Sequence, residues 1–147
     1  MNRRFCVAPM MGRTDRHERF FLRKLSSHAM LYTEMIHSNA ILNTRKEDML
    51  NFHNSELPLA VQIAGCNPID LAEVSKKCEF VGYKEINLNI GCPSNQVQKG
   101  NFGAILMKDP DLVAKCIESI KDKVKIPVTV KCRIGVDNMD ENSELTL

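Results

Sequence analysis

The residues of this 147-residue chain that could do chemistry lie where predicted strands end. Cys92 follows the apolar alternation EINLNI and stands between Gly91 and Pro93, at the start of a polar loop. A thiol in that place could be a nucleophile, a metal ligand or a proton donor. A nucleophile needs a base beside it, and no histidine lies near Cys92 in the sequence; a proton donor needs only correct placement. The alternative, a small buried hydrophobe, is disfavoured by the loop position.

Lys131 is the second such residue, because it interrupts an otherwise apolar strand. Strand alternation puts Thr129, Lys131 and Arg133 on one face. If that face is the interior of a barrel, the ammonium group cannot be solvated and needs an anionic partner. The partner could be a carboxylate such as Glu34, or a cofactor whose reduced form is an anion. Gln62, in the strand LAVQIA, could hydrogen-bond the same cofactor ring.

Other charged and metal-binding residue types give weaker indications. Arg16, Arg19 and Arg23 recur at helical spacing and predict a solvated helix face or, alternatively, a phosphate-binding one. The four histidines form no H-x-x-x-H or H-E-x-x-H pattern, and the six cysteines form no C-x-x-C pair. We therefore expect neither a metal site nor a disulfide framework.

The composition is that of an ordinary globular domain, with 44% hydrophobic and 26% charged residues. A net charge of +2 is too small to bind a polyanion without a local basic patch. No apolar run approaches the length of a transmembrane helix, and the start MNRRFCVAPM lacks the apolar core of a signal peptide. We expect a cytoplasmic protein with no membrane contact.

The candidate residues need a framework of alternating strands and helices to position them. Helices are expected after Thr14 or Asp15, after Asn67-Pro68 and after Asp109-Pro110, because these residues are typical of helix starts. An irregular polar stretch should separate the second strand from the third. We expect strands at residues 4–10, 31–35, 59–64, 85–90 and 127–134. This order predicts a parallel sheet with right-handed crossovers.

Two α/β architectures fit this order, an open doubly wound sheet and a (β/α)₈ barrel. No G-x-G-x-x-G follows the first strand, which disfavours a dinucleotide-binding open sheet. The unusual polar residues fall at the carboxyl ends of strands, where barrel enzymes gather their active sites. A complete barrel takes about 250 residues. The chain supplies four to five βα units, so the sequence predicts the front half of a TIM barrel.

Three fragments resemble the tRNA-dihydrouridine synthases: APM closing the first strand, LAVQIAG on the third and INLNIGCPS on the fourth. GNFGAILM and VTVKCRIG strengthen the resemblance, while TDRHERFFLR and LYTEM point to the A-type subfamily. The resemblance runs from about residue 4 to residue 137. It implies that residues 1–147 are the N-terminal part of an FMN-binding TIM-barrel catalytic domain. The rest of the barrel and a helical tRNA-binding domain would lie beyond Leu147.

The resemblance also implies a reaction. Such an enzyme reduces uridine to 5,6-dihydrouridine in the D-loop of tRNA, around the twentieth nucleotide, with NADPH as the reductant of FMN. By position, Cys92 would be the general acid that delivers a proton to C5 of a uracil turned out of the RNA. Asn89 and Arg133 would contact the tRNA.

The flavin contacts implied by the resemblance come from three strands. Pro9, Met10 and Met11 would pack under the isoalloxazine ring. Gln62 and Lys131 would bond its polar edge, and Lys131 would favour the anionic reduced ring.

Two alternatives remain open at this stage. The first is a flavin barrel of the dihydroorotate or dihydropyrimidine dehydrogenase kind, which acts on the same 5,6-bond of a free pyrimidine. The second is a truncated, non-catalytic fragment that touches RNA through Arg16, Arg19 and Arg23 but does not hold FMN. An open half-barrel would expose sheet edges and an apolar interior, so we expect the isolated chain to be unstable or to self-associate.

Overall fold

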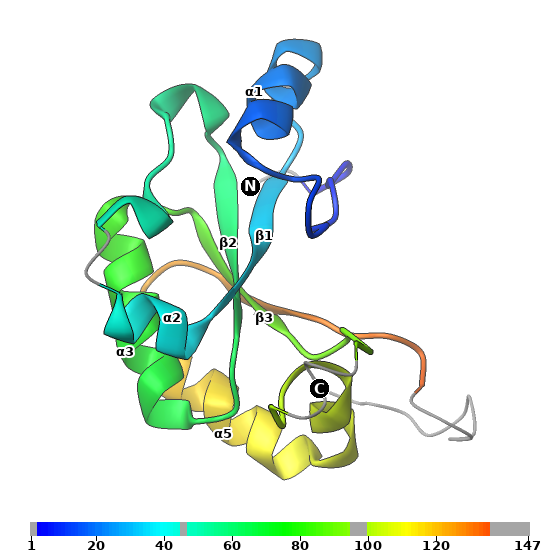
Figure 1. Cartoon of the computed structure of the whole chain (residues 1–147), viewed down its shortest axis with the longest axis vertical. Helices are drawn as coiled ribbons and strands as arrows, with labels where there is room; N and C mark the ends of the chain where they lie inside the picture. Colours follow the sequence, from blue (N-terminus) through cyan, green and yellow to red (C-terminus); the bar gives the residue numbers. More distant parts are fainter. Residues whose placement is uncertain (1–2, 45–46, 95–99, 136–147) are drawn as a thin grey trace.

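A parallel four-stranded sheet forms the centre of the molecule (Figure 1). The computed structural model describes residues 3–44, 47–94 and 100–135. The strands are β1 (Leu31–His37), β2 (Leu59–Ala64), β3 (Glu85–Asn89) and β4 (Val128–Lys131), in the order β1-β2-β3-β4. All neighbouring pairs are parallel. Strands that follow one another in space as they do in sequence are typical of a barrel, whereas a doubly wound sheet reverses its order.

Helices and short 3₁₀ turns connect the strands. The α-helices are α1 (Arg16–Leu25), α2 (Ser38–Asn43), α3 (Pro68–Val81) and α5 (Pro110–Lys121). The 3₁₀ turns are η1 (Glu47–Leu50), η2 (Asn54–Glu56) and η3 (Gly103–Lys108). Helices α3 and α5 pack against one another, and α1 lies apart from them beside the start of β1 (Figure 1).

Helix starts follow local capping rules. The side chains of Asp15, Asn67 and Asp109 accept hydrogen bonds from backbone N–H groups in the first turns of α1, α3 and α5. These bonds satisfy donors that the helix itself leaves unpaired. Helix α3 ends at Gly82, whose φ of 113° lies in the left-handed region that favours glycine. The predicted helix starts are confirmed.

The two faces of the sheet differ in character. The face toward α3 and α5 is apolar, and its side chains form one buried cluster with those of the helices, including Leu31, Val61, Ile63, Ile86, Leu88, Leu71, Val74, Cys78, Val113, Cys116 and Ile120. The other face carries buried polar side chains, among them Gln62, Glu85, Asn87 and Asn89. Strand register aligns these side chains, because Gln62 pairs with Asn87 and Ala60 with Glu85.

The ends of the sheet differ from the sequence expectation. In place of a strand at residues 4–10 there is one parallel bridge, between Cys6 and Met30. Pro9 has no N–H to continue the pairing, and the chain turns immediately afterwards, where Thr14 N–H donates to the Met10 carbonyl. The strand expected at 127–134 ends at Lys131, level with the end of β3. The stretch expected to be irregular contains α2, η1 and η2.

Two arginines of α1 correct a sequence prediction. Arg19 is only 6% exposed; its Nε lies 2.7 Å from Glu56 Oε2, and its Nη1 donates to the Thr14 carbonyl. Arg23 donates to four backbone carbonyls, those of Ser26, Ala29, Glu56 and Pro58. These side chains tie α1 to the segment before β2, so the predictions of a solvated or phosphate-binding stripe, and of RNA contact, are wrong for Arg19 and Arg23.

Replacement of Arg23 by lysine should destabilise the fold. The single lysine nitrogen cannot reach all the carbonyls that the two guanidinium nitrogens bond, so buried acceptors lose their donors. We expect Arg23→Lys to lower the free energy of unfolding by about 2 kcal/mol. Denaturant unfolding of the protein encoded by the native gene measures this free energy. The exposed Arg16 is the control: Arg16→Lys should change the midpoint little, and equal midpoints for the two variants would contradict the assignment.

Candidate active site

A cavity of about 220 Å³ opens at the carboxyl ends of the strands. Its lining residues are Pro9, Met11, Met35, Gln62, Asn89, Gly91, Cys92, Pro93, Lys131 and Arg133. The structure therefore brings together every predicted site residue except Met10. Met10 lies just outside the lining and is exposed; its carbonyl and N–H bond Thr14, which shapes the turn that presents Met11. Met35, Gly91 and Pro93 are lining residues for which the sequence suggested no role.

The turn that carries Cys92 is held on both sides. The backbone N–H groups of Gly91 and Cys92 donate to Asn89 Oδ1 at 3.1 and 3.0 Å. The Cys92 carbonyl accepts from the N–H of Ala104, at the start of η3. The thiol is free and partly exposed at the cavity. Its place is thus set by strand β3 and not by a loose loop, which is what a group that must deliver a proton requires.

Gly91 allows the ends of β3 and β4 to approach closely. A Cβ atom at position 91 would lie 3.0 Å from the Cys132 carbonyl carbon and 3.2 Å from the Lys131 oxygen. The neighbouring Ile90 N–H donates to that same Lys131 oxygen at 3.0 Å. Absence of a side chain at Gly91 therefore lets Cys92 and Lys131 reach one cavity.

Lys131 is exposed, and this corrects another prediction. β4 is the edge strand of the described sheet and has a neighbouring strand on one side only. Solvent therefore reaches the Lys131 side chain. Within residues 3–44, 47–94 and 100–135, the ammonium group has no carboxylate partner. Glu34, the carboxylate proposed from the sequence, instead accepts from the N–H of Gly12. The cofactor alternative for the partner of Lys131 stays a prediction.

The bond between Glu34 and Gly12 fixes the turn that follows the first extended segment. Gly12 has a φ of 70°, a conformation that glycine adopts without strain. The turn leaves Met11 66% exposed at the cavity rim. An apolar side chain thereby lines the same cavity as the amide of Gln62 and the ammonium group of Lys131.

His37, the last residue of β1, contacts Phe102, which directly precedes η3. Their rings meet edge to face with centroids 4.5 Å apart. His37 Nδ1 accepts the N–H of Asn39, and burial lowers the pKa of the imidazole, so His37 is neutral near pH 7. The contact thus joins the end of β1 to the start of η3.

Two other cysteines contrast with Cys92. Burial raises the pKa of Cys78 to about 12 and that of Cys116 to about 11. Both side chains belong to the apolar cluster between the sheet and the helices. A thiol that stays protonated in an apolar core is chemically inert, so these cysteines are packing residues.

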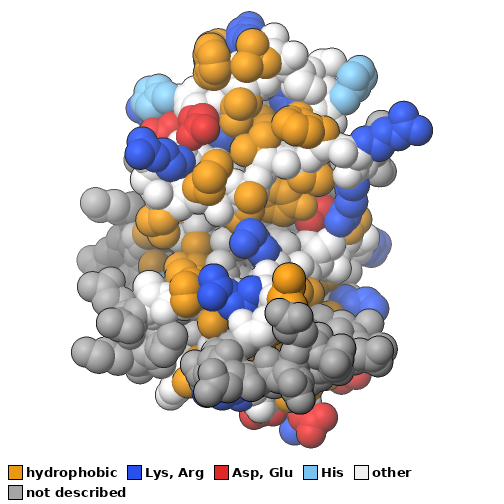
Figure 2. Space-filling model, turned by 90° about the vertical axis from the view of Figure 1, so that its right-hand side faces the viewer, with side chains coloured by type: hydrophobic (Ala, Val, Ile, Leu, Met, Phe, Trp, Pro, Cys, Tyr) orange, Lys and Arg blue, Asp and Glu red, His pale blue; other side chains and the backbone are white. Residues whose placement is uncertain are grey.

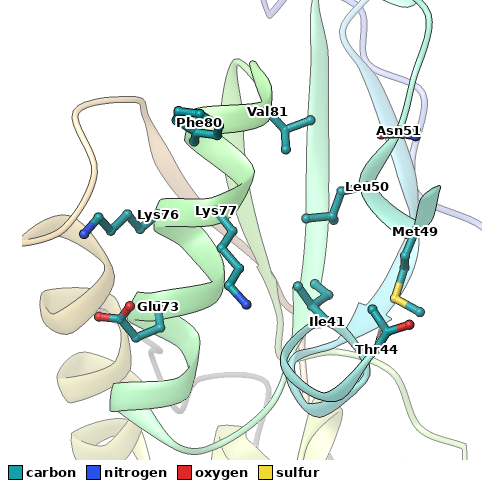
Figure 3. Close-up of a pocket in the computed structure, with 10 residues that line it drawn as sticks. All are labelled: Ile41, Thr44, Met49, Leu50, Asn51, Glu73, Lys76, Lys77, Phe80 and Val81. Atoms are coloured by element: carbon teal, nitrogen blue, oxygen red, sulfur yellow. The ribbon is translucent and has the colours of Figure 1, made fainter. Parts of the chain in front are cut away.

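A larger cavity lies on the helix side of the sheet (Figure 3). It measures about 990 Å³ and is lined by residues of α2, η1 and α3 with their flanks: Ile41, Thr44, Met49, Leu50, Asn51, Glu73, Lys76, Lys77, Phe80 and Val81. No predicted site residue lines it. It lies between helices and turns and not on the polar face of the sheet, which carries Gln62 and Asn89. Size alone therefore does not mark the active site here.

The model of the dihydrouridine synthase (Dus) family matches residues 6–146. The chain belongs to the dihydrouridine synthase family. This membership confirms that the sheet is the N-terminal part of a TIM barrel, and it argues against the dehydrogenase alternative.

Relatives in this family are about half identical to the chain over the region that matches. A protein of Shewanella oneidensis is 51% identical over 146 residues, which cover 99% of this chain and 43% of the relative. A protein of Synechocystis is 54% identical over 139 residues, which cover 95% of this chain and 42% of the relative. A protein of Vibrio cholerae is 52% identical over 143 residues, which cover 97% of this chain and 43% of the relative. All three are named tRNA-dihydrouridine(20/20a) synthase. The chain spans less than half the length of these dihydrouridine synthases.

The part of the chain that the structure describes contains no helix with the length and apolar character needed to cross a bilayer. It also contains no cluster of three or more His, Cys, Asp or Glu side chains placed to hold a metal ion.

A side chain at position 91 should disturb the site. Gly91→Ala forces β3 and β4 apart near the cavity, and we expect the free energy of unfolding to fall by about 2 kcal/mol. Because the Cys92 turn moves with Gly91, the alkylation rate of Cys92 should change while that of exposed Cys6 does not. Peptide-resolved mass spectrometry measures both thiols in one sample. An unaltered Cys92 rate together with full stability would show that the close approach is not needed.

Proposed function

We propose that this chain forms the N-terminal part of the catalytic barrel of a tRNA-dihydrouridine synthase. The reaction is reduction of the C5–C6 double bond of uridine in the D-loop of tRNA, at the positions 20 and 20a in the names of its relatives. The observation that carries the proposal is the cavity into which β2, β3 and β4 bring Gln62, Cys92 and Lys131. The cytoplasm, where tRNA is abundant, is the proposed location.

The residues around the cavity fit FMN. Pro9, Met11 and Met35 offer an apolar surface, while Gln62 and Lys131 offer an amide and a cation. A flavin ring has apolar faces and a polar edge, so both parts of this lining have a counterpart. When bound, FMN that NADPH has reduced would supply the hydride that adds to C6 of uracil. Lys131 would hold its positive charge beside a group that becomes an anion on reduction.

Cys92 would supply the proton. The thiol gives H⁺ to C5 of the uracil as C6 gains the hydride, so the pyrimidine takes up two hydrogens in total. The resulting thiolate regains a proton from solvent, which its partial exposure allows. The hydrogen bonds from Gly91 and Cys92 to Asn89 keep the sulfur in place during the transfer.

Asn89 and Arg133 would contact the tRNA. The Asn89 carbonyl oxygen already accepts two backbone N–H groups, and its amide nitrogen already donates to Gln62, which leaves one amide N–H for the nucleotide. Arg133 is exposed at the rim, where a guanidinium can bind phosphate. A target base would have to leave the RNA stack to reach the cavity.

The rest of the barrel would pack where the described part is open. The inner face beyond β4 has no neighbouring strand within the described residues. Figure 2 shows hydrophobic side chains exposed along one face, with Lys and Arg side chains among them. Exposed hydrophobic residues of the chain include Phe5, Phe20, Phe21 and Leu25. Such surfaces are expected to be covered in a complete protein.

Removal of the Cys92 thiol tests the proton-donor role. In the protein as its own gene encodes it, Cys92→Ala should retain FMN yet reduce tRNA uridine about 10²- to 10⁴-fold more slowly, the usual contribution of a positioned acid. Single-turnover reduction of tRNA by the prereduced protein measures the rate. Cys6→Ala, which removes an exposed thiol that does not line the cavity, is the matched control. Equal rates for Cys92→Ala and wild type would refute the role.

Replacement of Lys131 tests the flavin contact. Lys131→Met removes the cation that favours the anionic product of reduction, so the midpoint potential of the bound flavin should fall. A loss of about 1.4 kcal/mol in this interaction corresponds to about 30 mV for a two-electron couple. Lys131→Arg keeps the charge and should shift the potential less. Spectroelectrochemical titration gives the three potentials; if they coincide, Lys131 does not lie beside the ring.

A further inference from the structure

A chain of side-chain hydrogen bonds begins beneath Cys92. Asn89 Oδ1 receives the backbone N–H groups of Gly91 and Cys92, and Asn89 Nδ2 donates to Gln62 Oε1 at 3.0 Å. Gln62 Nε2 in turn donates to Asn87 Oδ1 at 2.7 Å. The three amide side chains are 7% exposed or less. Two residues placed at the cavity, Gln62 and Cys92, are thus linked through one asparagine.

The chain continues away from the cavity to a buried carboxylate. Asn87 Nδ2 donates to Thr129 Oγ1 at 2.9 Å, and the Thr129 hydroxyl donates to Glu85 Oε1. The Tyr32 hydroxyl donates to the same oxygen at 3.0 Å, and Arg3 lies 2.7 Å from Glu85 Oε2. Glu85 is fully buried and is the first residue of β3, at the end of the sheet opposite the cavity.

The groups at the two ends of this hydrogen-bond chain fix the direction, from donor to acceptor, of every bond in it. Backbone N–H groups can only donate, and an ionised carboxylate can only accept. Each amide between Asn89 and Asn87 therefore has one orientation that satisfies both of its neighbours, because rotating it by half a turn would set donor against donor and acceptor against acceptor. Tyr32 remains a donor, since burial and the charge of Glu85 raise the pKa of its hydroxyl above the usual range.

We propose that Glu85 and Thr129 are positioning residues of the reaction. Through Asn87 they fix the direction in which the Gln62 amide faces the cavity, and through Asn89 they support the Cys92 turn. Neither residue lines the cavity. The catalytic consequence rests on the proposed function, whereas the orienting role concerns only side chains that the structure describes.

The physical reason is the cost of leaving these groups without partners. If the Thr129 hydroxyl is removed, the Asn87 amide loses its acceptor and Glu85 loses a donor, both in a buried region. Asn87 Nδ2 is then a buried donor without an acceptor, so the Asn87 side chain is held only by its bond from Gln62 Nε2. Gln62 is then held firmly only at its Asn89 end.

Thr129 offers a matched pair of variants. Thr129→Val keeps the branched shape but removes the hydroxyl; Thr129→Ser keeps the hydroxyl but removes the methyl group. A positioning role predicts that the serine variant resembles wild type and the valine variant does not, whereas a packing role predicts the reverse. Ser75→Ala is the control, because Ser75 is buried on α3 and its hydroxyl has no hydrogen-bond partner within the described residues.

The first readout is the NMR spectrum of the protein encoded by the native gene, without flavin. The side-chain ¹⁵N–H signals of Gln62 and Asn87 report their hydrogen bonds directly. In Thr129→Val we expect both signals to shift and the Gln62 amide protons to exchange about 10-fold faster with solvent. In Thr129→Ser and Ser75→Ala the signals should match those of wild type. Wild-type signals in Thr129→Val, or equal changes in Thr129→Ser, would overturn the proposal.

The second readout uses the flavin-loaded protein. Thr129→Val should lower kcat for tRNA uridine reduction about 10-fold, because a catalytic group is misaligned, while KM for tRNA stays within about twofold. If Thr129→Val does not fold, Thr129→Ala decides: it removes the same hydroxyl with a smaller side chain, so the Gln62 signal and kcat should again change, and wild-type values would overturn the proposal. A wild-type protein that reduces no tRNA uridine would refute the proposed function, while the amide signals still test the orienting role.

Discussion

Buried hydrogen-bonding groups on the inner face of the sheet must satisfy one another, and the site depends on this constraint. Barrel interiors are usually filled by Val, Ile and Leu side chains. Here Gln62, Asn87 and Asn89 occupy that face, and parallel register sets them side by side across β2 and β3. A buried amide that lacks a partner is costly, so few arrangements of these three side chains are stable. The same bonds that stabilise the sheet therefore fix where Cys92 lies.

The two faces of the sheet have different roles. Apolar packing of β1, β2 and β3 against α3 and α5 stabilises the strands through the buried cluster that includes Val61, Leu88 and Cys116. The strands then act as rigid supports, and the candidate site residues lie near or just beyond their carboxyl ends. Sites built on such elements hold their groups more accurately than sites built on loops alone. The close approach at Gly91 adds the last condition, because it brings the ends of β3 and β4 together.

Features governed by neighbouring residues could be predicted from the sequence. Strand β2 has the bounds that its apolar run indicates, and Asn67 and Asp109 cap helices because each acts on the turn directly after it. Features that depend on residues distant in the sequence could not be predicted in this way. Arg19 finds Glu56, 37 residues away, and nothing in the local pattern distinguishes it from a solvated arginine. Lys131 is exposed because β4 is an edge of the described sheet, which strand alternation alone does not reveal.

The central claim is that this cavity belongs to an enzyme that makes dihydrouridine in tRNA. The most direct measurement is the dihydrouridine content of D-loop fragments of tRNA, determined by mass spectrometry, from the native organism with and without the gene. Our account predicts that the two uridines at the positions in the relatives' names remain unreduced after deletion. Their reduction should return with the wild-type gene. Unchanged dihydrouridine at both positions in the deletion strain would contradict the account.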